Sequence, residues 1–141
     1  MHDRLELLRA VVHPWHLDHF GHMNVRNYAP FFDDATYHMW TLLGLPYSSM
    51  QAKYNLHTVT AQATTRFIQE LNAGDLIVID GVVSRIGTRS CGFLLNMRHA
   101  DTGELHASYD LVEVFFDPVT RRSAPMPDTI RARLEDWLVA T

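Results

Sequence analysis

One short stretch of the chain combines residue types that could cleave a carbonyl compound. It runs from Asp18 to Tyr28 and reads Asp-His-Phe-Gly-His-Met-Asn-Val-Arg-Asn-Tyr. It places one carboxylate, at Asp18, and a turn-forming glycine, at Gly21, just ahead of an amphipathic segment rich in aromatic residues. A carboxylate beside a helix N-terminus can attack a carbonyl or activate water against it, while the helix end stabilises the oxyanion. The stretch therefore predicts a small acyl-transfer site.

The segment that follows has the pattern of a largely enclosed helix. Apolar residues form one stripe at 4-3-4-3 spacing, and others widen it: Tyr28, Phe32, Ala35, Met39 and Leu42, then Phe31, Trp40 and Leu43. We expect the helix to begin near Asn27, because Pro30 then falls in the first turn, where no backbone donor is lost. A turn over 24–27 should precede it, and Gly44 followed by Pro46 should end it.

Beyond this helix the apolar period changes to two, which is typical of strands. Candidate strands cover 59–67, 76–86, 93–97 and 105–115, with turns at 72–75 and 100–103. A short first strand is expected around Val11 and Val12, and a C-terminal helix is expected to begin at Asp128. Because one helix cannot cover both faces of a hairpin-connected sheet, the sequence predicts an α+β domain whose free face or edge meets another subunit.

Bulk properties exclude several classes of protein. The chain has 141 residues, which fits a single domain over 1–141, and a net charge of −4 argues against a nucleic-acid partner. A single cysteine, Cys91, leaves no intrachain disulfide and suits a reducing compartment. No apolar run approaches the roughly 18 residues of a membrane helix, and the first residues are too charged for a secretory signal. We therefore expect a cytoplasmic location and no membrane partner.

With these residues the chain resembles the 4-hydroxybenzoyl-CoA thioesterase branch of the hotdog-fold acyl-CoA thioesterases. The family motif D-x-x-G-H-V-N-N-x-x-Y is matched within 18–28, and its F-E-E-A-R segment is matched by Phe32-Asp33-Asp34-Ala35-Thr36. Later landmarks agree at 74–75, 85–90 and 116–118. The resemblance covers nearly the whole chain. It implies a hotdog fold: a mostly antiparallel five-stranded sheet wrapped around one long central helix, with a short C-terminal helix.

The resemblance also assigns roles to residues. Asp18 would be the nucleophile or the general base in the hydrolysis of an acyl-CoA thioester, and the backbone N–H of Val25 would hold the oxyanion. Residues placed near the substrate are Gly21, His22, Asn24, Tyr28, His57 and Thr58, the last two from a neighbouring subunit of a dimer or a dimer of dimers. Of these, we expect His22 to bond the loop that carries Asp18 and Asn24 to brace the turn. The resemblance implies no cofactor and no metal.

Departures from the family pattern bear on the acyl group. Val25 stands where a second asparagine is common, and Thr36 replaces the usual arginine. The Gly21-His22-Met23 and Asp34-Ala35-Thr36 variants look similar to thioesterase domains that act on betainyl-CoA, which would imply an aromatic cage for a quaternary ammonium. Candidates for such a cage are Trp15, Tyr37, Trp40 and Tyr54, although ordinary packing explains each of them. Asp33 and Asp34 are expected to be surface acids favoured by the helix dipole.

Two other functions remain open at this point. The chain could be a non-catalytic module that binds acyl-CoA or an acyl carrier. It could also be a metal-dependent hydrolase, because His13, His16, His19 and His22 recur every third residue and histidine is a common zinc ligand. Pro14 and Gly21 argue against a helix there, so we expect the four rings to be scattered. Coenzyme A would need a cationic rim, for which Arg85, Arg89, Arg98, Lys53 and Arg66 are equivalent candidates.

Overall fold

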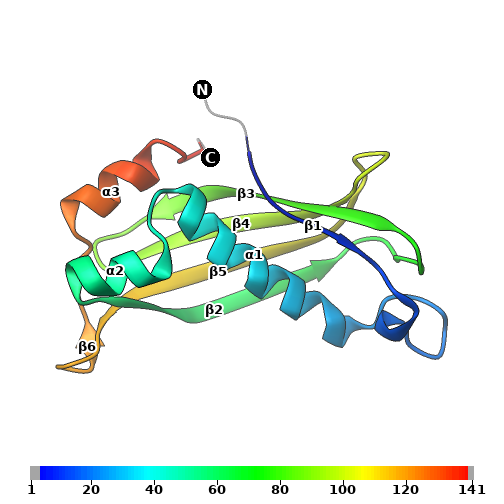
Figure 1. The fold of residues 1–141 in the computed structure, drawn as a ribbon, viewed down its shortest axis with the longest axis horizontal. Coiled ribbons are helices and arrows are strands. Elements are labelled where there is room, and N and C mark those ends of the chain that lie inside the picture. Colours follow the sequence, from blue (N-terminus) through cyan, green and yellow to red (C-terminus); the bar gives the residue numbers. More distant parts are fainter. Residues whose placement is uncertain (1–3, 140–141) are drawn as a thin grey trace.

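A computed structural model describes residues 4–139 and confirms the α+β architecture (Figure 1). The strands are β1 (Leu5–Val11), β2 (His57–Phe67), β3 (Leu76–Ile86), β4 (Ser90–His99), β5 (Leu105–Asp117) and the two-residue β6 (Arg122–Ser123). The α-helices are α1 (Tyr28–Leu42), α2 (Tyr47–Tyr54) and α3 (Asp128–Glu135), and two 3-10 turns, Pro14–His16 and Val25–Asn27, precede α1. None of the helices in this part of the chain is long and apolar enough to cross a membrane.

The strands form one antiparallel sheet in the order β1-β3-β4-β5-β2, with β6 paired to the end of β5. The sheet curls around α1, which crosses one of its faces (Figure 1). This is the hotdog arrangement that the sequence resemblance implied. Short turns join β3, β4 and β5, whereas β2, which directly precedes β3 in the sequence, lies at the far edge of the sheet and pairs only with β5.

Helix α1 provides the centre of the core. Phe32 and Met39 are fully buried on its inner stripe, and Trp40 packs edge-on against Phe93 of β4 at 5.0 Å between ring centroids. Phe32 also stacks on Tyr109 of β5 at 4.8 Å. Burial of such large side chains is the main term that stabilises a domain of this size. The 3.6-residue period read from the sequence is therefore confirmed as the buried face of the helix from Tyr28 to Met39, whereas Leu42, the last residue of the predicted stripe, is 50% exposed.

The helix begins where the sequence predicted, but its cap differs in detail. Asn27 occupies the N-cap position, yet its side chain donates to the carbonyl of His16 and does not cap the helix. Asn24 is the residue whose side chain caps the preceding turn, by accepting from the N–H of Arg26 at 3.1 Å. At the other end of the chain, Pro127 is the N-cap of α3 and Asp128 is its first residue, not its cap.

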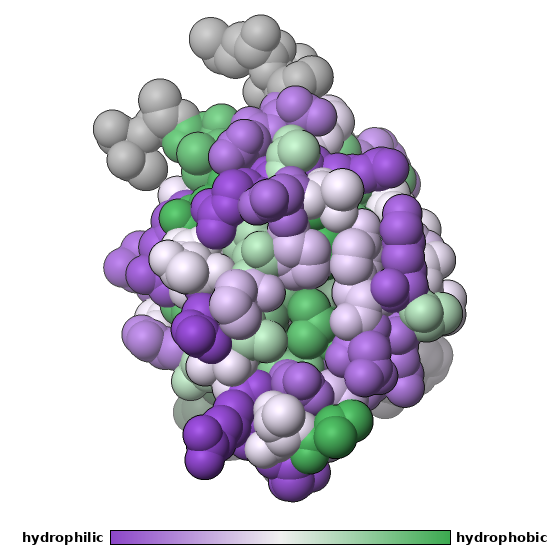
Figure 2. Space-filling model, turned by 90° about the vertical axis from the view of Figure 1, so that its left-hand side faces the viewer, coloured by the Kyte–Doolittle hydropathy of each residue, from purple (hydrophilic) through white to green (hydrophobic). Residues whose placement is uncertain are grey.

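Two elements were not predicted from the sequence. Helix α2 follows Pro46 directly and buries only Met50, so it shows no apolar period that could be recognised. Strand β6 is too short to show any alternation. With α3, helix α2 covers one end of the core. Figure 2 shows that end, where mostly hydrophilic side chains surround a smaller hydrophobic area.

Strand β2 is largely exposed within the single chain. It forms one edge of the sheet, and Val59 and Phe67 are 44% and 49% exposed. Figure 1 shows the strand beside α1, with α2 near its first residues. A long edge strand with exposed apolar side chains is a surface on which another chain can pair.

Candidate active site

A tight turn fixes the carboxylate of Asp18. Its side-chain Oδ1 accepts a hydrogen bond from the N–H of Phe20 at 2.9 Å, and its carbonyl accepts from the N–H of Gly21 at 3.1 Å. The N–H of Asp18 in turn donates to the carbonyl of His22 at 2.9 Å. This Asx-type geometry uses one carboxylate oxygen for the loop and leaves the other free for chemistry. Asp18 is half-buried.

Gly21 makes the turn possible through its backbone conformation. Its φ is +86°, a left-handed value that residues with a side chain rarely adopt. A Cβ added at this position would meet no atom within 4 Å. The glycine is therefore needed for its φ, as expected of a turn-forming residue, and not for the close approach of another segment.

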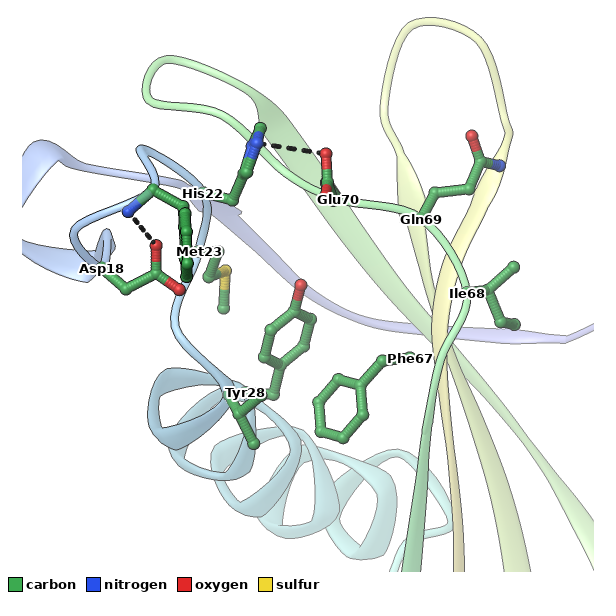
Figure 3. Close-up of a pocket in the computed structure, with 10 residues that line it drawn as sticks. Asp18, His22, Met23, Tyr28, Phe67, Ile68, Gln69 and Glu70 are labelled. Carbon is green, nitrogen blue, oxygen red and sulfur yellow. Dashed lines mark hydrogen bonds and ion pairs between the residues drawn. The ribbon is translucent and has the colours of Figure 1, made fainter.

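Asp18 lines a pocket of about 550 Å³ at the N-terminal end of α1. The other walls come from the first motif, including Val25 and Tyr28, and from the segment 67–70 that follows β2. Figure 3 shows the Tyr28 hydroxyl pointing into the space between Asp18 and Glu70, with the ring of Phe67 beside it. The side chains of Ile68 and Gln69 point away from Asp18. An acid, a phenol and apolar walls therefore share one open pocket.

Val25 lines the same pocket, and its backbone N–H has no hydrogen-bond partner among residues 4–139. Val25 is the first residue of the 3-10 turn, so its N–H has no acceptor inside the turn. The next N–H, that of Arg26, is already used by the Asn24 side chain. Val25 thus offers a free donor at the positive end of a helical segment, the arrangement that favours a developing oxyanion.

Tyr28 is buried, with 4% of its surface exposed, and packs edge-on against Phe67 at 4.9 Å between ring centroids. Burial raises the pKa of its hydroxyl, and the nearby carboxylates of Glu70 and Asp18 raise it further. Tyr28 therefore remains protonated at neutral pH and can donate a hydrogen bond into the pocket.

His22 ties the Asp18 loop to the opposite wall. Its Nε2 lies 3.1 Å from a carboxylate oxygen of Glu70, and its Nδ1 lies 3.1 Å from the side-chain oxygen of Asn72 (Figure 3). A backbone bond from Met23 to the carbonyl of Leu71, at 2.8 Å, joins the same two segments. The sequence analysis expected His22 to bond the loop that carries Asp18; its side chain bonds the segment 70–72 instead, and within the loop only its backbone carbonyl takes part, by accepting from the N–H of Asp18.

The structure separates the residues that the sequence analysis had placed near the substrate. Asp18, His22, Val25 and Tyr28 line the pocket, whereas Gly21 and Asn24 act in the turn behind it. His57 and Thr58 lie at the opposite end of β2 from Phe67 and do not line this pocket. The sequence analysis missed the wall formed by 67–70, because nothing in that stretch alone indicates that it folds back onto the first motif.

The four-histidine pattern does not form a metal centre. Within 4–139, no three histidine, cysteine, aspartate or glutamate side chains converge as metal ligands. The rings of His13 and His16 lie together, 5.7 Å apart between centroids, and pack against Trp15 and Phe31, whereas His19 contacts Phe20 and His22 meets Glu70. The metal-dependent hydrolase is therefore not favoured by the geometry.

Of the four candidates for an aromatic cage, Trp15 and Tyr54 do not line the pocket that Tyr37 and Trp40 share. Trp15 is 72% exposed in the first 3-10 turn, and the hydroxyl of Tyr54 lies 2.5 Å from that of Thr129, near α3. Tyr37 and Trp40 do line one small pocket, beside Tyr47 of α2, which the sequence analysis did not single out. Among the arginines considered for coenzyme A, Arg98 is paired with Asp80 and Arg89 donates to the carbonyl of Ser123.

Cys91 is not a second nucleophile. It is fully buried on β4, and burial raises the pKa of its thiol well above the usual range. A neutral buried thiol does not attack a thioester.

Comparisons with known proteins identify the family of this chain. A family model described as the thioesterase-like superfamily matches residues 12–134. The comparison with curated proteins returned no match.

Solved structures with the same fold are also similar. A 1,4-dihydroxy-2-naphthoyl-CoA thioesterase from Synechocystis is 13% identical, covers 95% of this chain and 97% of its own, and has a TM-score of 0.81. A hypothetical protein from Staphylococcus aureus in complex with CoA is 19% identical, covers 100% and 90%, and has a TM-score of 0.83. A gentisyl-coenzyme A thioesterase is 22% identical, covers 90% and 98%, and has a TM-score of 0.77.

Proposed function

This chain belongs to the thioesterase-like superfamily, and we propose that it hydrolyses acyl-CoA thioesters with Asp18 as the reactive acid. It is a thioesterase of the hotdog fold, and what we propose is the role of its residues in the hydrolysis. One observation carries the proposal: a held carboxylate and a free backbone donor line the same pocket at the beginning of α1.

In the first route, an Asp18 oxygen attacks the thioester carbonyl and the Val25 N–H stabilises the oxyanion. The carbon–sulfur bond then breaks, which gives a mixed anhydride and the thiolate of coenzyme A. Water hydrolyses the anhydride and returns the carboxylate. In the second route, Asp18 takes a proton from a water that attacks the carbonyl directly. The free carboxylate oxygen serves either route.

The leaving group explains why so few residues are needed. The thiol of coenzyme A should resemble that of cysteine, with a pKa of about 8.5, so the thiolate can leave without prior protonation. No dedicated general acid is required. The protonated Tyr28 hydroxyl is placed to hold a water or the substrate in the pocket.

Coenzyme A as the carrier is supported by the similar structures: one of them holds CoA and two are named thioesterases of aryl-CoA substrates. The exposed β2 edge supports a homodimer or a dimer of dimers, in which His57 and Thr58 of one subunit would approach the pocket of the next.

The test is a hydrolysis assay with Asp18→Asn. Acetyl-, hexanoyl- and benzoyl-CoA are mixed with the protein, and the released thiol is followed with a chromogenic disulfide. We expect turnover by the unaltered protein and a loss of about 10²–10⁴-fold in kcat/KM for the variant. Asp34→Asn is the matched control, since Asp34 is an exposed acid on α1 that lines neither this pocket nor the one beside Tyr47.

The two rival functions give different results in the same assay. A non-catalytic module would bind acyl-CoA, measured by calorimetry, without releasing thiol, and Asp18→Asn would change nothing. A metal-dependent hydrolase would lose activity in a chelator and regain it with zinc. Full activity of Asp18→Asn would refute the proposed role of the carboxylate.

A further inference from the structure

His22 and Glu70 belong to opposite walls of the pocket that Asp18 lines. Figure 3 shows His22 reaching from the first motif across to Glu70, on the segment that follows β2. Among the described residues, no lysine or arginine lines this pocket, so His22 is the lining side chain that can carry a positive charge. The roles proposed for Asp18 and Val25 make no use of this pair.

Both ring nitrogens of His22 face oxygen atoms. Nε2 lies 3.1 Å from Oε2 of Glu70, and Nδ1 lies 3.1 Å from Oδ1 of Asn72. A carboxylate oxygen and an amide oxygen can only accept, and a neutral imidazole has one N–H to donate. The imidazolium donates to both partners, and its charge strengthens the bond to the carboxylate. The contacts therefore fit the protonated form of His22.

The segment that His22 contacts is itself fixed to the sheet. The carbonyl of His106, on β5, accepts from the N–H groups of Ile68 and Gln69 at 2.9 and 3.1 Å. The ring of His106 donates back through Nδ1 to the carbonyl of Glu70 at 3.0 Å. The ring of His22 therefore connects the loop of the reactive acid to a segment that is anchored on a central strand.

From this geometry we infer that His22 is a positioning residue that works as an imidazolium. With its proton, the ring clamps the loop of Asp18 to the segment 70–72. Without the proton, one of the two side-chain bonds is lost. The N–H of Asp18 donates to the carbonyl of His22, so a loosened clamp displaces the carboxylate from its place near Val25. The inference rests on the proposed hydrolysis of acyl-CoA and adds a pH-dependent element to it.

The clamp should act on the reaction more than on stability. The Glu70 side chain is 72% exposed and that of His22 is 36% exposed. Ion pairs with this exposure contribute little to the free energy of unfolding. A small misplacement of a reacting group, in contrast, costs a large factor in rate.

The other titratable groups around His22 predict a different pH dependence. Asp18, on the same loop, and Glu70, on the opposite wall, act as anions, so their protonation reduces activity on the acid side. Burial raises the pKa of Tyr28, at the beginning of α1, and the two carboxylates raise it further, so the phenol stays protonated well above neutral pH. His106 makes its bond to the Glu70 carbonyl as a neutral ring, so loss of a proton does not break that bond. A fall in activity on the alkaline side therefore reports His22.

The main experiment is the pH profile of kcat/KM for hexanoyl-CoA between about pH 5 and 9, followed through the ultraviolet absorbance of the thioester. We expect a fall of about 10-fold on the alkaline side. Glu70→Gln removes a negative charge beside the ring and should move the fall to lower pH by about 0.5–1 pH unit. Asn72→Asp adds a negative charge at the other nitrogen and should move the fall to higher pH by a similar amount.

Two further variants complete the comparison. His22→Gln should have a low kcat/KM at every pH and no alkaline fall, because the titrating group is gone. Glu135→Gln removes an exposed carboxylate on α3, outside the lining of this pocket, and should leave the profile unchanged. Glu70 and Asn72 are exposed, so their variants remain informative if His22→Gln fails to fold.

Nitrogen NMR of isotope-labelled histidine gives a readout without turnover. Long-range proton–nitrogen correlations distinguish an imidazolium from the two neutral tautomers. We expect both ring nitrogens of His22 to be protonated at about pH 6, and the loss of the proton to move in opposite directions in Glu70→Gln and Asn72→Asp. A neutral ring at that pH, with the amide nitrogen of Asn72 turned towards Nδ1, would overturn the inference.

The kinetic outcomes separate this inference from the proposed function. A profile that stays level on the alkaline side, or a fall that survives in His22→Gln, would overturn the clamp and leave the thioesterase intact. Shifts in the same direction in Glu70→Gln and Asn72→Asp would also overturn it. If no acyl-CoA is hydrolysed but NMR finds the imidazolium and the two opposite shifts, the protonated contact stands and the proposed function fails.

Discussion

Replacing Gly21 by alanine tests how the turn presents the catalytic carboxylate. The φ of +86° is disfavoured for alanine, and the added methyl group would meet no atom within 4 Å. The whole cost therefore comes from the backbone conformation, about 1–2 kcal/mol. Urea denaturation followed by circular dichroism should show that loss in the free energy of unfolding.

Relaxation of the backbone strain in Gly21→Ala should also displace the carboxylate of Asp18. The Gly21 N–H and the Phe20 N–H both bond to Asp18, so a change in the turn moves the carboxylate relative to the Val25 N–H. A misplacement of about 1 Å can cost on the order of 10²-fold in rate. We expect kcat/KM for acyl-CoA to fall by about 10- to 100-fold in Gly21→Ala.

Gly103 provides a matched control. It has a φ of +76°, its Cβ position is equally open, and it lies in the β4–β5 hairpin. Gly103→Ala should lose about the same 1–2 kcal/mol of stability and keep its activity. Equal activity of the two variants would refute the claim that the turn positions the acid, and an unchanged stability of Gly21→Ala would refute the argument from φ.

Two further predictions concern Glu113 and the β2 edge. The pKa of Glu113 is higher in the folded protein than in the unfolded chain. At a pH above both pKa values, the ionised carboxylate therefore lowers the free energy of unfolding, and this loss of stability disappears below the unfolded pKa of about 4.3. Glu113→Gln should therefore stabilise the protein by on the order of 1 kcal/mol near neutral pH. Urea titrations should show this gain becoming smaller as the pH is lowered, and an equal destabilisation at every pH would contradict the argument. Light scattering should find that the protein forms dimers or tetramers. Val59→Lys on the exposed β2 edge should shift the protein towards monomers. If the unaltered protein is a monomer, the proposed assembly is wrong.

Periodicity explains why much of the fold was predictable. Helix α1 carries a clear apolar stripe between a cap position and Gly44, and strands β3 to β5 alternate between recognisable turns. These signals are local, because each depends on residues a few positions apart. Helix α2 lacked such a signal, since only Met50 of its eight residues is buried.

The sequence predicted the part of the site that is formed by residues close together in the chain. Asp18, Gly21 and Val25 belong to one stretch, and the structure finds them in one turn and at one helix start. The opposite wall depends on long-range folding: Glu70 reaches His22 across 48 positions of sequence, through backbone pairing that no local pattern specifies. The 67–70 segment could be placed only once the curl of the sheet was known.

Glu113 interrupts the alternation of apolar residues along β5, and this interruption could be seen in the sequence. It occupies the same register as Leu111 and Phe115, the inward-facing positions of β5, so the alternation of the strand places a carboxylate where an apolar residue would pack. Polar residues at buried positions reduce stability and are retained where function needs them. Its neighbours, Thr60 from β2 and Asp33 from α1, come from distant parts of the chain. The interruption of the pattern was visible in the sequence, but its meaning, an acidic pocket lined by aromatic rings, required the register of β2 against β5.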